Sequence, residues 1–197
     1  MIPLGTGVHW LAITRAARVR PRHNEHIRDT LAKAFGVTGD LRLHVRINAP
    51  RHGNVVVFPH AKAAYKEWPE DCWEAVLSAL PDAWVIPATG RTFCGRQGQR
   101  VDREGLIHVI AGARLVIAVD SGPVHVADAV GVPVVGLYAA TSSRTYGPYN
   151  DATHCVDRHR EASDELGLAY DSARHLCDGA AMLRIKPDDV LEAIAHV

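Results

Sequence analysis

Short, wholly apolar runs alternate with amphipathic segments along most of this chain. Valine- and isoleucine-rich runs at residues 54–59, 83–90, 114–119 and 132–138 are bounded by turn residues, which is typical of strands. Because these runs are apolar throughout rather than at every second position, we expect each strand to be buried on both faces of a sheet. Four such strands predict a sheet in the interior of the protein.

The segments between these runs have helical patterns. Residues 69–82 begin with proline, which favours the first position of a helix, and residues 103–113 and 122–131 follow the next two strands. Strands joined by helices imply right-handed crossovers and therefore parallel pairing. The pattern predicts an α/β fold built on a doubly wound, Rossmann-like parallel sheet.

Both ends of the chain depart from this alternation. Residues 21–36 predict an amphipathic helix that ends at Gly36, with Ile27, Leu31, Ala34 and Phe35 on one stripe. Residues 141–179 are rich in serine, aspartate, histidine and arginine, and we expect long loops there with at most one more strand. A terminal helix is predicted over residues 186–197.

This organisation divides the chain into two unequal parts. We expect residues 1–47 to form a short helical amino-terminal extension that includes a connector helix. Residues 48–197 are then expected to form a single Rossmann-like domain.

Composition narrows the class of protein. The chain has 197 residues, of which 47% are hydrophobic, and its 22 basic residues balance its 22 acidic ones. Balanced charge argues against nucleic acid or an anionic membrane as the main partner. No apolar run approaches the roughly 20 residues of a membrane span, and the first residues do not resemble a signal peptide. Four widely spaced cysteines lack short C-x-x-C spacings, so we expect reduced thiols, a cytoplasmic location and no metal site.

The turn after the strand at residues 114–119 is the strongest candidate for a binding site. It reads Asp120-Ser121-Gly122-Pro123, with His125 two residues further on. Glycine allows a close approach of the backbone, and proline begins a helix without losing an amide hydrogen bond. The amides of a helix N-terminus bind anions, so we expect a phosphate-bearing ligand here.

Two neighbouring strands are also followed by polar loops. His60, Lys62 and Lys66 follow the strand at residues 54–59, and a hydroxyl-rich loop, Thr141-Ser142-Ser143-Arg144, follows the strand at residues 132–138. Ligands of open parallel sheets bind at the carboxyl ends of the strands, where these loops are expected to meet. Lysine and hydroxyl groups suit the oxygens of a diphosphate.

Simpler interpretations remain open for each of these residues. Asp120 or Ser121 can be only a helix N-cap, and the lysines and serines can be ordinary solvated loop residues. Ser121 and His125 also invite a hydrolase interpretation, but no third member of a triad is evident. The sequence has no G-x-G-x-x-G, no P-loop and no G-x-S-x-G elbow.

These motifs together resemble the ADP-heptose-dependent heptosyltransferases of lipopolysaccharide assembly, a glycosyltransferase family of the two-domain GT-B fold. The family's Lys-x-Trp-Pro is matched at Lys66 to Pro69, and its Asp-[Thr/Ser]-Gly-x-x-His-x-x-x-Ala at Asp120 to Ala129. A Gly-x-Pro begins at Gly131, and a Thr loop ends in Gly-Pro at Pro148. The resemblance covers about residues 22–197 and implies a single, carboxyl-terminal GT-B half that binds the donor.

The resemblance implies roles for individual residues. It places a donor diphosphate against Lys66, Thr141 and the loop from Asp120 to His125, and the nucleoside near the turn that contains Thr89. The full set of expected binding residues is His60, Lys66, Thr89, Asp120, Ser121, Gly122, Pro123, His125 and Thr141. The family's acidic ribose contact is not clear in the stretch that follows the turn. Catalytic residues are not assigned, because the expected general base belongs to an acceptor domain that has no counterpart in the first 20 residues.

Two functions are therefore carried forward. The first is a glycosyltransferase-like protein that binds an ADP-linked sugar as donor substrate, without a further cofactor, and transfers the sugar to a glycan. The second is a non-catalytic nucleotide or nucleotide-sugar binding module, and a degenerate structural remnant is a third possibility. In either of the first two cases, a second copy or a partner chain is expected to supply the acceptor domain.

Overall fold

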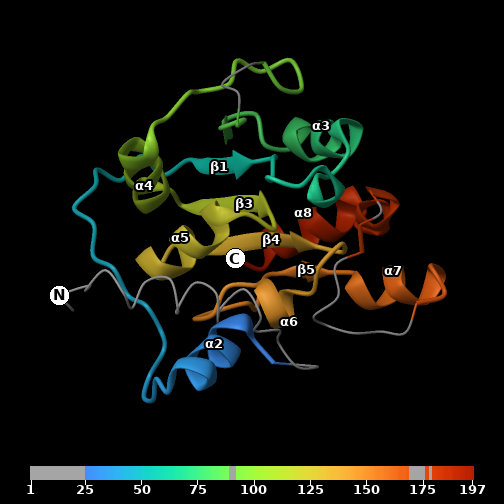
Figure 1. Ribbon diagram of the computed structural model, residues 1–197. Helices are drawn as coiled ribbons and strands as arrows, with labels where there is room; N and C mark the ends of the chain where they lie inside the picture. The colour runs from blue at the N-terminus through green and yellow to red at the C-terminus, as the bar shows by residue number, and fades with distance from the viewer. Residues whose placement is uncertain (1–24, 89–91, 169–175, 178) are drawn as a thin grey trace.

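The computed structural model describes residues 25–88, 92–168, 176–177 and 179–197. Five parallel strands form one sheet in the order β2-β1-β3-β4-β5, with helices on both sides (Figure 1). The predicted α/β fold with a doubly wound parallel sheet is confirmed.

The central strands are short and apolar, as the sequence indicates. β1 (Val55–Phe58), β3 (Leu115–Val119) and β4 (Val134–Tyr138) are buried along their whole length. β2 (Trp84–Val85) and β5 (Val156–Asp157) form the edges and have two residues each. The run at residues 83–90 thus contributes less strand than predicted, although residues 89–90 lie outside the described part of the chain.

Alternate residues of the central strands enter two different cores. Val56, Val116 and Ala118 pack with side chains of α4 (Arg103–Gly112) and α5 (Gly122–Val130) on one face. The residues between them face α3 (Glu70–Ser78) and α8 (Pro187–Ala195) on the other. Burial of both faces explains why the strands are apolar at every position.

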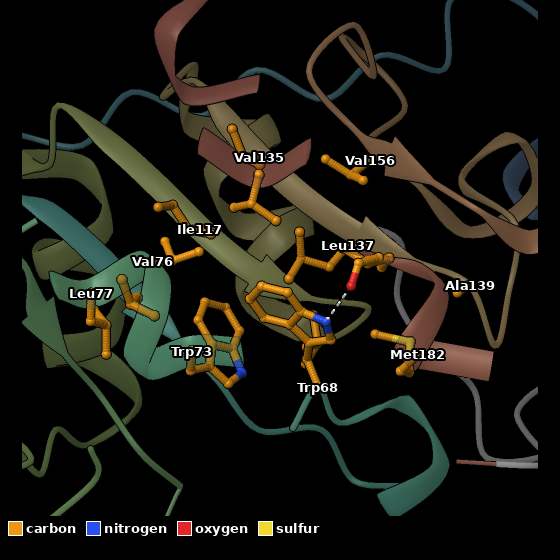
Figure 2. Close-up of a cluster of buried hydrophobic side chains, with 14 of the residues drawn as sticks. Trp68, Trp73, Val76, Leu77, Ile117, Val135, Leu137, Ala139, Val156 and Met182 are labelled. Atoms are coloured by element: carbon orange, nitrogen blue, oxygen red, sulfur yellow. Dashed lines mark hydrogen bonds between the residues drawn. The ribbon is translucent and has the colours of Figure 1, made fainter. Parts of the chain in front are cut away.

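The second core is built around two tryptophans. Trp68 and Trp73 are almost fully buried and meet edge to face with ring centroids 5.1 Å apart (Figure 2). The Trp68 indole donates a hydrogen bond of 3.1 Å to the carbonyl of Ile185, which fixes the segment before α8. This core holds the loop after β1 in place, and that loop carries Lys66.

The strand order creates a reversal beside the centre of the sheet. β1 pairs with β2 on one side and with β3 on the other, so successive connections leave β1 and β3 in opposite directions. In doubly wound sheets of this order, the crevice outside the carboxyl ends of these two strands is the usual ligand site. Lys66 and Asp120 follow those two strands.

The carboxyl-terminal third is more regular than predicted. Besides β5, the region contains α6 (Ser143–Tyr146) and α7 (His159–Glu165), where the sequence suggests loops and at most one strand. Neither helix has a long enough apolar stripe to be recognised from its pattern, because each is short. A 3-10 helix over Gly179–Arg184 then leads to α8.

Two further details correct the sequence analysis. Pro69 is the N-cap of α3 rather than its first helical residue, with an extended backbone. Phe35 is 40% exposed at the end of α2 (Ile27–Phe35), although the stripe predicted it on the apolar face. The buried residues of this helix are Thr30 and Ala32, so its packed face is rotated relative to the prediction.

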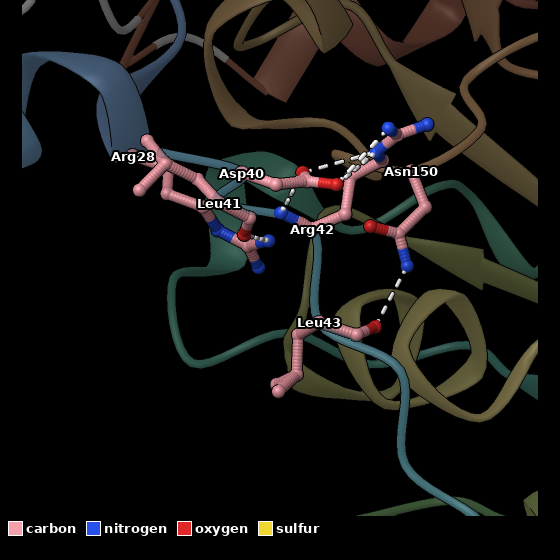
Figure 3. Close-up of polar contacts among 6 residues, drawn as sticks. All are labelled: Arg28, Asp40, Leu41, Arg42, Leu43 and Asn150. Carbon is pink, nitrogen blue, oxygen red and sulfur yellow. Dashed lines mark hydrogen bonds and ion pairs between the residues drawn. The ribbon is translucent and has the colours of Figure 1, made fainter. Parts of the chain in front are cut away.

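The connector between α2 and β1 has no regular secondary structure and is held by polar contacts. The guanidinium of Arg28 donates to the carbonyl of Leu41 at 2.9 Å, and the amide of Asn150 donates to the carbonyl of Leu43 at 2.8 Å (Figure 3). Asp40 and Arg42 form an exposed ion pair beside them. The first contact joins the connector to α2, and the second joins it to the loop after α6.

Helix α2 itself docks on the same loop. His26 bonds the carbonyl of Gly147 at 3.1 Å, and the Tyr149 hydroxyl donates to Asp29 at 2.5 Å. The Arg28 guanidinium lies over the Tyr149 ring, 4.5 Å from its centroid. The described part of the extension therefore packs against the sheet domain.

None of the described helices has both the length and the apolar character that crossing a bilayer requires.

Candidate functional site

The turn after β3 leaves the N-terminus of α5 without a side-chain cap. Ser121 occupies the N-cap position, but its hydroxyl donates back to the carbonyl of Val119 at 3.0 Å. Pro123 has no amide hydrogen, so the first turn of α5 has fewer free backbone N–H donors. The donors that remain have no side-chain cap, and they lie at the positive end of the helix dipole. Ser121 therefore holds the N-cap position without capping the helix through its side chain, which leaves a helix start of the kind that suits an anion.

Three strand-end loops meet at Asp120. Its Oδ2 accepts hydrogen bonds from the Lys66 Nζ and from the Thr141 hydroxyl, each at 2.6 Å. The Lys66 and Asp120 side chains are 18% and 8% exposed, and Thr141 is fully buried. The loops after β1, β3 and β4 thus converge on one carboxylate that is oriented by two donors.

His125 lies one turn into α5 beside this cluster. Burial lowers the pKa of its imidazole below the ordinary value of 6.5, and the nearby Asp120 carboxylate opposes that shift. The neutral ring favoured near pH 7 can gain a proton if an anion binds next to it. Since the Ser121 hydroxyl is bound to the Val119 carbonyl, the pair does not form a hydrolase dyad.

A cavity of about 480 Å³ adjoins the turn. It opens at the carboxyl ends of β1 and β2, and its walls combine apolar and polar side chains, with Pro123 at the start of α5 as one border. Its lining residues are Phe58, His60, Ile86, Pro87, Ala88, Arg100, Val101, Asp102, Leu106 and Pro123. Two other cavities, of about 330 and 500 Å³, lie at the opposite edge of the sheet, away from this cluster.

The remaining residues expected to bind the ligand do not all lie at the Asp120 cluster. His60 lines the cavity, with Nδ1 3.4 Å from the Glu67 carboxylate and its ring edge-on to Phe93. Gly122 borders open space, because a Cβ built on it meets no atom within 4 Å. Thr89 lies outside the described residues. His60 therefore lines the cavity and does not belong to the Asp120 cluster.

Some candidate phosphate-binding residues are used elsewhere. The hydroxyls of Ser142 and Ser143 both donate to Asp157, at 3.2 and 2.7 Å, and Ser142 also caps α6. Lys62 is exposed on the surface. Of the loop residues named from the sequence, Lys66 and Thr141 are the ones that contact Asp120.

Three residues near the site were not singled out by the sequence. Arg100 and Asp102 line the cavity from the segment before α4. The third residue is Tyr146 in α6, whose ring centroid lies 5.9 Å from the Lys66 Nζ. Asp102 is recognisable as a helix N-cap, which explains its identity without any ligand. Only the packing of α4 beside α5 brings it to the cavity.

Comparison with known proteins gives one consistent family. The family model described as glycosyltransferase family 9 (heptosyltransferase) matches residues 99–170. Lipopolysaccharide heptosyltransferase 1 of Escherichia coli K12 is 29% identical over 150 residues, which cover 64% of this chain and 47% of that protein. The chain thus spans about half the length of the curated relatives it matches.

Solved structures share the fold. A family 9 glycosyl transferase from Veillonella parvula superposes with a TM-score of 0.63 at 17% identity, covering 90% of this chain and 61% of that one. TibC of enterotoxigenic E. coli, an iron-containing dodecameric heptosyltransferase determined with ADP-D-beta-D-heptose, gives 0.61 at 16%, covering 87% and 53%. At these identities the likeness concerns the fold. With the sequence matches, it confirms that this chain is related to the heptosyltransferases of glycosyltransferase family 9 over about half of their length.

Proposed function

We propose that this chain binds a nucleotide-diphosphate sugar, ADP-linked and of the heptose type, as the donor half of a glycosyltransferase. The observation that carries the proposal is the Lys66, Asp120 and Thr141 cluster beside the uncapped start of α5. The domain division follows from it, with residues 48–197 forming the donor-binding domain and residues 1–47 the extension.

Electrostatics at the cluster favour a diphosphate. Lys66 supplies a charged donor, and the α5 N-terminus supplies backbone amides and a partial positive charge. His125 adds a further positive charge if a bound phosphate raises its pKa. Because Gly122 borders open space, a phosphate can approach the backbone there.

Asp120 has a different use, since a carboxylate repels phosphate. Its Oδ2 is taken by Lys66 and Thr141, which leaves Oδ1 as an acceptor with a fixed orientation. A sugar hydroxyl is the complementary donor. The cluster therefore suits a ligand in which a sugar lies directly beside a diphosphate.

The nucleoside fits the neighbouring cavity. Pro123 belongs both to the phosphate turn and to the wall of the 480 Å³ space, so a ligand can continue from one into the other. The apolar side chains of its walls suit a base, and the polar side chains suit ribose hydroxyls and base edges. ADP-D-beta-D-heptose is the ligand named for the structural neighbour TibC.

Transfer needs groups that the described residues do not identify. We propose that an acceptor domain comes from a partner chain or a second copy and brings the general base with it. The alternative function, a non-catalytic nucleotide-sugar binding module, uses the same donor contacts. The four cysteines are free thiols, which fits the reducing environment of a cytoplasm.

No metal is used in this proposal. TibC is named as iron-containing, but the residues described here include no group of three or more histidine, cysteine, aspartate or glutamate side chains that could hold a metal ion. The donor set for such a site is therefore not found among them.

Gly122→Ala tests the donor site. The new methyl group enters open space in the protein alone, so the fold should be unaffected, but it occupies the position where a phosphate approaches the turn. We expect ADP to bind the variant roughly 10-fold to 100-fold more weakly by calorimetry, the loss of about one charge-assisted hydrogen bond. Gly179→Ala is the matched control, because its Cβ also meets no atom within 4 Å, at the start of the 3-10 helix. Equal ADP affinity in both variants would contradict the proposal.

Sugar transfer separates the two functions. The chain alone should bind ADP and an ADP-sugar, and transfer should appear only when a chain with an acceptor domain is added. Binding without transfer under every pairing would favour the non-catalytic module. Transfer by the chain alone would show that a group within this sequence serves as the base.

A further inference from the structure

His26 joins helix α2 to a loop 121 residues further along the chain. The residue is the N-cap of α2, and its Nδ1 accepts a hydrogen bond of 3.1 Å from the Arg28 amide. On the other side of the ring, Nε2 lies 3.1 Å from the carbonyl oxygen of Gly147, the residue that ends α6. One imidazole therefore caps the helix and also ties it to the sheet domain.

These two contacts fix the protonation state of the ring. A backbone amide can only donate a hydrogen bond and a carbonyl oxygen can only accept one, so Nδ1 must lack a proton and Nε2 must carry one. The neutral, Nε2-protonated imidazole is the form that makes both bonds. A second proton would set a ring N–H against the N–H of Arg28 and would remove the cap.

The surroundings of His26 oppose a positive charge on the ring. Burial lowers the pKa of the imidazole below its ordinary value of 6.5, and the Arg28 guanidinium acts in the same direction. The ring also lies at the positive end of the α2 dipole. His26 in turn helps to lower the pKa of His125 in α5, so positive charge on both rings at once is unfavourable.

The acidic groups that favour the charged ring are engaged with other partners. Asp29 and Asp128 raise the pKa of the imidazole. However, Asp29 accepts a hydrogen bond from the Tyr149 hydroxyl, and both oxygens of Asp128 accept bonds from backbone amides of the loop after α6. Glu25, next to the cap, pairs with Lys33. A second proton on the ring therefore gains little from these carboxylates.

Helix α2 is held mainly by polar contacts. Its buried residues, Thr30 and Ala32, are small. Among the described residues, neither apolar core of the sheet domain includes a side chain of this helix. Segments with few buried apolar contacts can open locally while the rest of a protein stays folded. We therefore expect that α2 can separate from the sheet domain without unfolding it.

We propose that His26 is a proton-sensitive switch, which holds α2 against the loop after α6 while its imidazole is neutral and releases the helix when the ring gains a second proton. The other contacts between α2 and this loop, from Arg28 and Asp29 to Tyr149, come from the same first turn and are lost with it. The attachment of the amino-terminal extension thus depends on pH. This switch goes beyond the proposed function, because it needs no nucleotide.

The size of the effect follows from the pKa of the ring in the two states. The released ring has the ordinary pKa of 6.5, and the docked ring has a lower one. The docked helix binds fewer protons, so release becomes more favourable as the pH falls. From about pH 7.5 to about pH 5.5, the equilibrium constant for release should rise roughly 3-fold to 10-fold. A factor of about 10 is the limit for one group whose docked pKa lies below that range.

Hydrogen exchange followed by NMR, on the protein without nucleotide, measures this release. After correction for the intrinsic pH dependence of exchange, the amides of α2 should lose roughly 3-fold to 10-fold of their protection over this pH range. The amides of β3 report global unfolding and should remain better protected than those of α2 at both pH values.

His26→Asn separates the switch from the cap. Asparagine is a good N-cap and can still accept from the Arg28 amide, but its shorter side chain loses the bond to Gly147 and does not titrate. The α2 amides should therefore be less protected at neutral pH, and their pH response should disappear. His108→Asn is the matched control and should keep the full response, because it removes an exposed imidazole of α4 that also bonds a backbone carbonyl.

An NMR titration of the imidazole nitrogens supplies a second test on the unaltered protein. At neutral pH, His26 should be neutral and protonated on Nε2, and its second proton should bind as the α2 amides lose protection. A doubly protonated ring in a helix that stays protected would overturn the inference, and so would an unchanged pH response of α2 in His26→Asn. Either result would leave the proposed function standing, since neither measurement involves a nucleotide.

Discussion

The pair of Lys66 and Asp120 should stabilise the fold as well as bind a ligand. The Nζ and Oδ2 atoms are 2.6 Å apart, and the side chains are 18% and 8% exposed. Exposed ion pairs contribute about 0–1 kcal/mol, whereas removing one member of a fully buried pair costs about 3–5 kcal/mol. This pair lies between those limits, and Thr141 still bonds the carboxylate if the lysine is lost.

We therefore expect Lys66→Met to lower the free energy of unfolding by about 1–3 kcal/mol. Methionine keeps most of the length of the lysine side chain but leaves the Asp120 charge without its partner. Adding Asp120→Asn should restore part of the loss, because the neutral amide can still accept from Thr141. A coupling energy of about 1 kcal/mol or more is expected from the double-mutant cycle.

The unfolding free energies of this cycle can be measured by urea titration with tryptophan fluorescence as the signal. Trp68 and Trp73 are 3% and 0% exposed, so their emission should report the loss of the core. For a chain of this size, each 1 kcal/mol also moves the Tm by about 2–4 °C. A coupling below about 0.5 kcal/mol, or a double variant less stable than Lys66→Met, would refute the reasoning. Lys66→Met should separately weaken ADP binding, so affinities must be measured where both proteins are folded.

Two further predictions concern the fold and its pH dependence. Gly136→Ala should destabilise the protein by about 1–3 kcal/mol in the same urea assay, because its Cβ would lie 2.7 Å from the buried Tyr138 ring; Gly179→Ala, in open space, should not. His125 has a pKa lowered by burial, so the unfolded chain binds more protons there, and stability should fall as the pH drops from about 7.5 to about 5.5. His125→Gln should show a smaller fall in urea midpoint over that range, and an identical fall would contradict the assignment; His26 shifts in the same direction and accounts for a remaining part.

Hydrophobic pattern alone was enough to predict the sheet. The strands at Val55–Phe58, Leu115–Val119 and Val134–Tyr138 are apolar at each position because both faces are buried, and this signal is local and strong. The end of α5 at Gly131 is equally local, since its backbone is left-handed, with φ of 74°. By contrast, α6 and α7 are too short for periodicity to reveal them.

The sequence also pointed to the loops after strands β1, β3 and β4, through Lys66, Asp120 and Thr141, which the structure brings into contact. What it could not determine is how these side chains are used. From sequence, Asp120 is compatible with a helix cap, and Ser142 and Ser143 are compatible with ligand groups. The fold places Asp120 against Lys66, and Ser142 and Ser143 against Asp157.

Tertiary structure alone decided which of the polar residues share a site. Arg100 and Asp102 precede α4 and are separated from the turn at Asp120 to Pro123 by a whole helix and strand, so no local pattern joins them to it. They meet the same cavity because α4 and α5 pack side by side on one face of the sheet and both begin at its carboxyl edge. Local propensity fixes the elements, but distances between residues far apart in the chain are set by the packing that buries their apolar faces.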